Sequence, residues 1–182
     1  YYPFVGSDAM AIYAYAARKI FFAGAMEGWR IPDMDWYAGT YPLLLPFSYV
    51  YAWQAMGEVN EYLAKIYPAA FHIATVGATY ALGRQLFGHR AGVISALVLS
   101  VTPFFTRWDL YGIGDVPVTF YLILATLMVY HWLKTLDWRS AIICGLLFGL
   151  AMWTKNSATP FGAFLLGAVA FLGYVRWRVE SP

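Results

Sequence analysis

Charged residues are scarce in this chain. They make up 12% of its 182 residues, whereas 61% of the residues are hydrophobic. An average soluble domain carries about 25% charged residues, so this chain has too little polar surface to cover a globule in water. The composition therefore excludes an ordinary water-soluble protein. The net charge of +2 excludes little, because in a membrane protein the side on which the charges lie is the informative quantity.

Several functional signals are also missing. The single cysteine, Cys144, rules out an internal disulfide, and its apolar neighbours favour a packing role. His72 and His131 stand alone in apolar blocks, without the HxH, HExxH or CxxC spacings of metal sites. The chain also lacks a glycine-rich phosphate loop, a nucleophile elbow and a nucleic-acid-binding motif. These absences argue against an enzyme of the soluble type and against a nucleic-acid partner.

Five apolar blocks between residues 66 and 178 predict transmembrane helices. Each has roughly 14 to 19 residues before its flanks are counted, near the lower limit for a span. The predicted fold is an all-α, polytopic transmembrane helical bundle. The chain starts without a methionine or a signal-like segment and stops directly after the last block, so we expect a fragment of a longer polytopic protein. The predicted spans cover residues 66–83, 91–108, 117–133, 140–153 and 157–175.

Basic residues at every second junction between these blocks set the predicted orientation. Cytoplasmic loops are enriched in lysine and arginine, which assigns the first 65 residues and the turns at 107–116 and 154–156 to the outer side. The acidic residues also fall on that side, except Asp137 and Glu180. We therefore expect an integral protein of the bacterial cytoplasmic (inner) membrane with its first loop outside. The six residues assigned to the cytoplasmic side are Arg84, Arg90, Lys134, Arg139, Arg176 and Arg178.

Residues 1–65 are typical of an outer loop that carries two juxtamembrane helices. Apolar residues recur at helical spacing over 9–23, which predicts an amphipathic helix on the membrane surface. The block at 42–57 is also apolar, but counting it as a span would put Arg84 and Arg90 outside. We therefore expect this block to lie at the outer interface, where aromatic side chains gather.

Lys155 stands on the predicted outer side, where basic residues are disfavoured. Such a cation needs an anion partner or an anionic ligand, although an interfacial lysine that extends into water is the competing interpretation. Asp115 lies just before a valine and a proline, which suits a helix N-cap. Arg107 and Asp109 are consistent with a local ion pair of little energetic weight.

Asp8 stands alone at the start of the predicted amphipathic helix. It fits a helix N-cap, and it also fits a general base at a membrane-facing cleft. Asp33 and Asp35 form a DxD pair, for which we favour a solvated loop over a cation site. A divalent metal held by Asp8 with Asp109 or Asp115 stays open as a cofactor, but no spacing requires it.

Four segments of the chain form a recognisable series: VGSDAMAIYAYAARK, TYPLLLPFSYVYAW, ATYALGRQLFGHRAGVISALVLSVTPFFTRWDLYGIGDVPVTFYLILA and GLLFGLAMWTKNSATP. The series resembles the membrane glycosyltransferases of the GT-C superfamily. It is most similar to family 39, which includes protein O-mannosyltransferases and bacterial lipid A aminoarabinose transferases. The resemblance runs from about Asp8 to about Pro160, and its most specific part lies between Gly83 and Val118.

The resemblance implies an enzyme that takes a sugar from a polyprenyl-phosphate carrier at the outer membrane face. It maps the catalytic aspartate onto Asp8 and the phosphate-facing lysine onto Lys155. Two departures stand out: Ala9 follows Asp8 where many members have a second acidic residue, and Thr40 and Tyr41 stand where some branches have another, a role that Asp33 or Asp35 would then fill. The candidate catalytic residues are Asp8, Asp109 and Asp115, and the candidate substrate-binding residues are Arg107, Lys155 and Tyr41.

Two other functions remain open at this point. One is a non-catalytic integral membrane subunit of a larger complex, with membrane-protein partners. The other is a transporter that uses outer carboxylates for ion coupling, but the chain has no ionisable residue other than histidine in mid-span and no visible inverted repeat. We favour the glycosyltransferase, whose partners would be the lipid bilayer and a polyprenyl-phosphate sugar donor.

Overall fold

The computed structural model describes residues 4, 6, 8–25 and 41–180, without the side chains of 108–110, 173, 175–177, 179 and 180. Within these residues the regular structure is helical and no strand occurs, which confirms the all-α part of the predicted fold. The elements are η1 (Ala9–Ala14), α1 (Tyr15–Ala23), α2 (Leu44–Met56), α3 (Glu61–Ala64), α4 (Ile66–Phe87), α5 (His89–Ser100), α6 (Pro103–Tyr111), α7 (Asp115–Thr135), α8 (Trp138–Thr154) and α9 (Ala158–Glu180).

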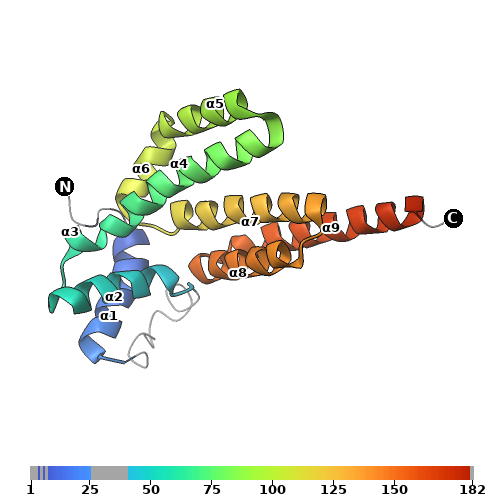
Figure 1. Cartoon of the computed structure of the whole chain (residues 1–182). Coiled ribbons are helices and arrows are strands. Elements are labelled where there is room, and N and C mark those ends of the chain that lie inside the picture. The colour runs from blue at the N-terminus through green and yellow to red at the C-terminus, as the bar shows by residue number, and fades with distance from the viewer. Residues whose placement is uncertain (1–3, 5, 7, 26–40, 181–182) are drawn as a thin grey trace.

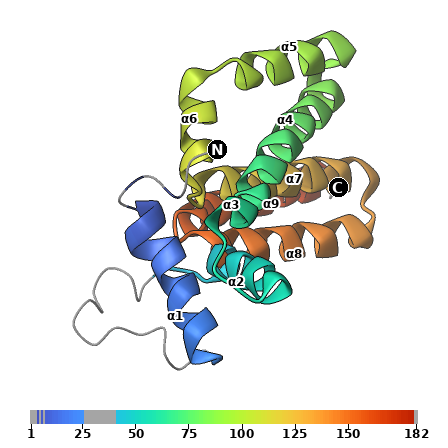
Figure 2. The same ribbon diagram turned by 90° about the vertical axis from the view of Figure 1, so that its left-hand side faces the viewer.

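The first helices gather at one end of the molecule. Helix η1 runs directly into α1, and both pack with α2 against the ends of the longer helices (Figures 1 and 2). Helix α2 reaches α8 through a ring contact between Phe47 and Trp153, whose centroids are 6.0 Å apart. These elements match the helices predicted over 9–23 and 42–57; their assignment to an outer loop stays a prediction.

The most completely buried large side chains lie at this same end. Tyr13 of η1 and Tyr49 and Trp53 of α2 are among the largest fully buried side chains. Phe4 packs on Tyr49 with ring centroids 4.9 Å apart, and Ile113 of the α6–α7 turn joins the same core. Burying a large apolar side chain contributes about 1.5–3 kcal/mol, so this aromatic core fixes the α6–α7 turn against η1 and α2.

A charged cluster ties the first residues to α3. Glu61 forms an ion pair with Arg18 of α1, and it also accepts a 3.0 Å hydrogen bond from the backbone N–H of Phe4. Asn60 caps α3 by accepting a hydrogen bond from the Leu63 N–H at 3.0 Å. The start of the chain is therefore anchored four residues before Asp8.

The longer helices form two layers that lean apart. Helix α7 packs against α8 on one side and α4 on the other, while α4 and α5 form a hairpin that projects away from α8 and α9 (Figure 1). Two glycines allow the hairpin to close. A Cβ on Gly92 would lie 2.8 Å from the carbonyl oxygen of Tyr80, and one on Gly83 would lie 3.0 Å from the Cα of Gly92. Larger residues would force these two helices apart.

The sequence predicted one helix over 91–108, but the structure divides this segment into α5 and α6. The break falls at Val101 and Thr102, just before Pro103. A residue that precedes proline is disfavoured in the α conformation, and proline suits the first turn of a new helix. The chain therefore changes direction here, and the axis of α6 lies at a steep angle to that of α5 (Figure 2).

The long helices expose many large apolar side chains. Ile73, Leu97 and Phe164 have 73%, 59% and 75% of their surface exposed. Extended apolar surfaces of this kind are typical of membrane or protein contacts. Among the described helices one, Asp115–Thr135, is both long and apolar enough to cross a bilayer, whereas His89–Ser100, Trp138–Thr154 and Ala158–Leu172 are apolar but shorter. The five-span bundle therefore stays a prediction.

The helix ends fall into two groups. The α4–α5 turn, the α7–α8 turn and the C-terminal end of α9 lie away from α1 and α2, while the α6–α7 and α8–α9 turns lie beside them (Figure 1). The sequence positions of the six basic residues predicted to be cytoplasmic all belong to the first group. The charge alternation in the sequence therefore corresponds to two ends of the folded chain.

Candidate functional site

Two turns that are distant in sequence meet beside η1. One leads from α6 into α7, and the other leads from α8 into α9. Asp115 is the first residue of α7, and Lys155 ends α8 in an extended conformation. The Lys155 Nζ donates a 2.6 Å hydrogen bond to Asp115 Oδ1, and the side chains are 25% and 45% exposed. This ion pair therefore joins the two turns at the edge of the buried core.

Glycines let the α6–α7 turn approach its neighbours closely. Gly112 has a φ of +71°, and a Cβ there would lie 2.6 Å from the ring of Phe4. Its carbonyl accepts a 2.8 Å hydrogen bond from the Tyr49 hydroxyl. A Cβ on Gly114 would lie 2.7 Å from the Tyr13 hydroxyl and 3.3 Å from the Thr154 carbonyl. Gly114 is thus the point at which η1 and both turns converge.

Tyr13 occupies the centre of this arrangement. Its side chain is 1% exposed, and its ring meets that of Tyr41 edge to face at 6.0 Å. Burial raises the pKa of Tyr13 strongly, and the negative charge of Asp115 raises it further. A hydrogen bond with the Gly114 backbone lowers this pKa, while Tyr41 and Asp8 add small increases. Tyr13 is therefore a neutral phenol among the carboxylates of the site.

Asp8 and Asp115 do not act as the helix caps that their sequence positions suggested. Asp8 immediately precedes η1, but its side chain makes no capping hydrogen bond there. Its carboxylate is close enough to Tyr13 to influence the pKa of that phenol. The N-cap of α7 is Gly114, while Asp115 directs its carboxylate to Lys155. The Asp115 carboxylate therefore faces Lys155, and the Asp8 carboxylate lies within electrostatic range of Tyr13.

Arg107 lies on α6, the helix that leads into the α6–α7 turn. Its Nε donates a 2.9 Å hydrogen bond to the hydroxyl of Tyr111, and its guanidinium carbon is 5.8 Å from the centre of that ring. Tyr111 in turn lies against Gly6, where a Cβ would be 3.7 Å away. Arg107 is therefore connected through Tyr111 to Gly6, two residues before Asp8 in the sequence.

Four of the candidates are linked through Tyr13: Tyr41 packs against its ring, the charges of Asp115 and Asp8 act on its phenol, and Lys155 is paired with Asp115. Asp109 belongs to α6, but its side chain lies outside the described residues, as do Asp33 and Asp35 entirely. Within the described part of the chain, no group of three or more His, Cys, Asp or Glu side chains could hold a metal ion.

Tyr13 was not identified from the sequence. The amphipathic pattern over 9–23 assumes α-helical spacing, whereas η1 is a π-helix, whose backbone hydrogen bonds join residues five apart. Asp8 and Tyr13 are separated by five residues. The π-helical turn after Asp8 sets the position of Tyr13, and the residue pattern does not reveal such a turn.

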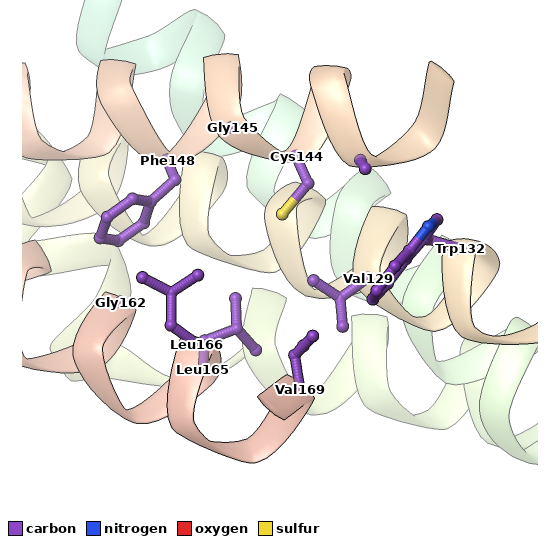
Figure 3. Close-up of a pocket in the computed structure, with 10 residues that line it drawn as sticks. Val129, Trp132, Cys144, Gly145, Phe148, Gly162, Leu165, Leu166 and Val169 are labelled. Carbon is purple, nitrogen blue, oxygen red and sulfur yellow. The ribbon is translucent and has the colours of Figure 1, made fainter. Parts of the chain in front are cut away.

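An apolar pocket of about 250 Å³ lies between α7, α8 and α9, away from this cluster (Figure 3). Cys144 contributes its thiol to the lining, consistent with the packing role favoured by the sequence. The Phe148 ring covers Gly162 so closely that any Cβ at 162 would collide with it. The lining is almost entirely hydrocarbon, so this pocket adds no polar group to the charged cluster.

Comparison with known families gives one clear match. Residues 42–181 match the family model described as dolichyl-phosphate-mannose-protein mannosyltransferase, which confirms the resemblance to GT-C glycosyltransferases. The matched region includes Asp115 and Lys155 and begins after Asp8, Tyr13 and Tyr41. Neither the curated proteins nor the solved structures gave a match to the chain.

Proposed function

The chain belongs to the dolichyl-phosphate-mannose-protein mannosyltransferase family, and on that premise we propose that it transfers a sugar from a polyprenyl-phosphate donor to an acceptor at the outer membrane face. The family is one of membrane glycosyltransferases of the GT-C type. The observation that carries the proposal is the Asp115–Lys155 ion pair, which joins two turns that meet η1, the helix that Asp8 precedes.

The chemistry requires a base and a cation on opposite sides of the reacting sugar carbon. Asp8 would accept the proton of the acceptor hydroxyl as its oxygen bonds to the anomeric carbon. The bond from that carbon to the phosphate oxygen breaks, and the polyprenyl phosphate leaves with the electron pair. Lys155 would stabilise the charge that grows on this phosphate. A partly buried location strengthens both effects, because water screens the charges less.

The remaining candidates have supporting roles in this proposal. Asp115 would hold the ammonium of Lys155 in position until a phosphate approaches. Arg107 would supply a second positive charge, and Tyr41 would contact the substrate beside Tyr13. Asp109 would contribute a further carboxylate from the second outer loop. A divalent metal is not required by this arrangement.

The grouping of helix ends supports an outer location for the site. The ends that carry Arg84, Arg90, Lys134 and Arg139 lie opposite the cluster, and lysine and arginine are enriched in cytoplasmic loops. The exposed apolar surfaces of the long helices would then contact lipid or further helices. On this proposal the five predicted spans carry the site to the outer surface of the cytoplasmic membrane.

The test is sugar transfer by an Asp8→Asn variant in membranes. Polyprenyl-phosphate mannose with a radiolabelled sugar serves as the donor probe, and the membranes supply the acceptors. The matched control is Asp137→Asn, because Asp137 caps α8 at the opposite end of the molecule and asparagine also caps helices. General-base catalysis contributes about 10²–10⁴-fold, so we expect a loss of that size in Asp8→Asn alone.

Three results would contradict this proposal. One is near-normal transfer by Asp8→Asn. Another is no transfer by the wild-type protein together with stoichiometric co-purification of membrane partners, which would identify a non-catalytic subunit. Equal loss in both variants would also contradict a specific role for Asp8.

A further inference from the structure

We propose that Tyr13 is a positioning residue, which holds the Asp115–Lys155 ion pair in place through its contact with the Gly114 turn. The kinetic consequence of this inference rests on the proposed function, whereas its structural consequence does not. Tyr13 would act through Asp115 and Lys155 rather than by contact with the sugar.

Two contacts hold the Tyr13 side chain. Its hydroxyl lies at Gly114, so close that a Cβ on Gly114 would be only 2.7 Å away. Gly114 is the N-cap of α7 and therefore directly precedes Asp115. The ring of Tyr13 is fixed from the other side by Tyr41. A displacement of the hydroxyl would therefore be passed to the residue that holds Lys155.

Because Tyr13 is buried, the loss of its hydroxyl contact would cost stability. A buried phenol is normally hydrogen-bonded, and removing it leaves its partner without a hydrogen bond in the interior, which destabilises the fold. The Thr154 carbonyl lies 3.3 Å from where a Cβ on Gly114 would be, so the turn that carries Lys155 rests on the same glycine. The Tyr13 hydroxyl therefore contacts Gly114, the glycine that precedes Asp115 and against which the Lys155 turn packs.

The neutral state of Tyr13 suits this role. A negatively charged phenolate beside Asp115 would repel the carboxylate and compete for the Lys155 ammonium. Burial and the nearby carboxylates raise the pKa of Tyr13 above its ordinary value, which keeps the phenol protonated. The phenol oxygen can therefore accept the hydrogen bond of the Gly114 backbone without adding a negative charge to the cluster.

The test compares Tyr13→Phe with Tyr49→Phe. Both substitutions remove one hydroxyl from a fully buried tyrosine that contacts the same turn, but Tyr49 donates to Gly112, three residues before Asp115. A purely structural role predicts the same effect for both. A positioning role predicts that Tyr13→Phe alone loosens the ion pair.

The measurement is the rate at which Lys155 is acetylated by acetic anhydride, read by mass spectrometry relative to Lys19 and Lys134. It is made on the protein in proteoliposomes and needs no donor or acceptor. We expect Tyr13→Phe to raise the relative labelling of Lys155 about fivefold, the factor for one lost net hydrogen bond. Tyr49→Phe should leave this ratio within about twofold of the wild type. That factor corresponds to about half the net free energy of one hydrogen bond or less.

A second variant approaches the same contact from the other side. Gly114 has a φ of −72°, so Gly114→Ala is compatible with its backbone, yet the added Cβ would displace the Tyr13 hydroxyl. This variant should also raise the labelling of Lys155, and it retains the tyrosine if Tyr13→Phe does not fold.

The inference is overturned if Lys155 labelling stays unchanged in both Tyr13→Phe and Gly114→Ala. It is also overturned if labelling rises equally in Tyr49→Phe, or if Lys19 and Lys134 become reactive in parallel. Failure of the proposed function gives a different result, because Asp8→Asn would then retain sugar transfer while the lysine labelling still changed as expected.

Discussion

The Asp115–Lys155 ion pair gives the most quantitative prediction. Exposed ion pairs contribute about 0.2–1 kcal/mol to stability, whereas breaking a buried pair costs about 3–5 kcal/mol. The two side chains are 25% and 45% exposed, and their 2.6 Å contact is short. This pair lies between those limits, so we expect a coupling energy of about 1–2 kcal/mol.

A double-mutant cycle measures this quantity. Asp115→Asn, Lys155→Met and the double variant are unfolded thermally in detergent, and the departure from additivity gives the coupling. The control cycle combines Asp115→Asn with Lys134→Met. These residues lie at opposite ends of α7, roughly 29 Å apart at 1.5 Å per residue, so their effects should add within about 0.5 kcal/mol. A coupling below about 0.3 kcal/mol for Asp115 and Lys155 would refute the ion pair as a link between the turns.

Three further perturbations test contacts at the site and elsewhere in the fold. Gly162→Leu should destabilise the protein by about 1–3 kcal/mol because Phe148 fills that space, and adding Phe148→Ala should restore part of the loss in thermal unfolding. Glu61→Ala should cost about 1–3 kcal/mol, since it releases Arg18 and the Phe4 N–H, and Lys19→Ala on the same helix should change the midpoint little. The raised pKa of Tyr13 favours the protonated phenol in the folded state, so its contribution to stability should be fully present below pH 10.0 and be lost as the pH rises further. Tyr13→Phe should therefore reduce the loss of stability at alkaline pH in unfolding curves. An unchanged pH dependence would argue against a raised pKa at Tyr13.

The sequence pattern predicted the helices well where apolar blocks ended at charged residues. Helices α4, α7, α8 and α9 begin or end within a few residues of the expected bounds because each block is followed by a polar junction. The 91–108 segment was predicted as one helix because its apolar character is continuous. Pro103 was the local signal of the break, and the continuous hydrophobicity concealed it.

The site was only partly predictable. Lys155 stands at a helix end that we predict to be outer, where the sequence indicated an anion partner, an anionic ligand or a lysine that extends into water. The structure pairs it with Asp115. Which anion pairs with Lys155 depends on a contact between residues 40 positions apart, and no local spacing encodes such a contact. Tyr13 depended in addition on a π-helical turn and on the close approach that Gly114 permits. Tertiary packing supplied both, which is why residue patterns alone did not contain them.

The proposed function requires Asp8 for the transfer of a sugar from a polyprenyl-phosphate carrier. The most direct measurement is release of polyprenyl phosphate by the protein reconstituted in proteoliposomes with polyprenyl-phosphate mannose and extracted acceptors. We predict one polyprenyl phosphate released per sugar transferred by the wild-type protein, and a loss of both products together in Asp8→Asn. Equal release by the two proteins, or sugar transfer without release of the carrier phosphate, would contradict the claim.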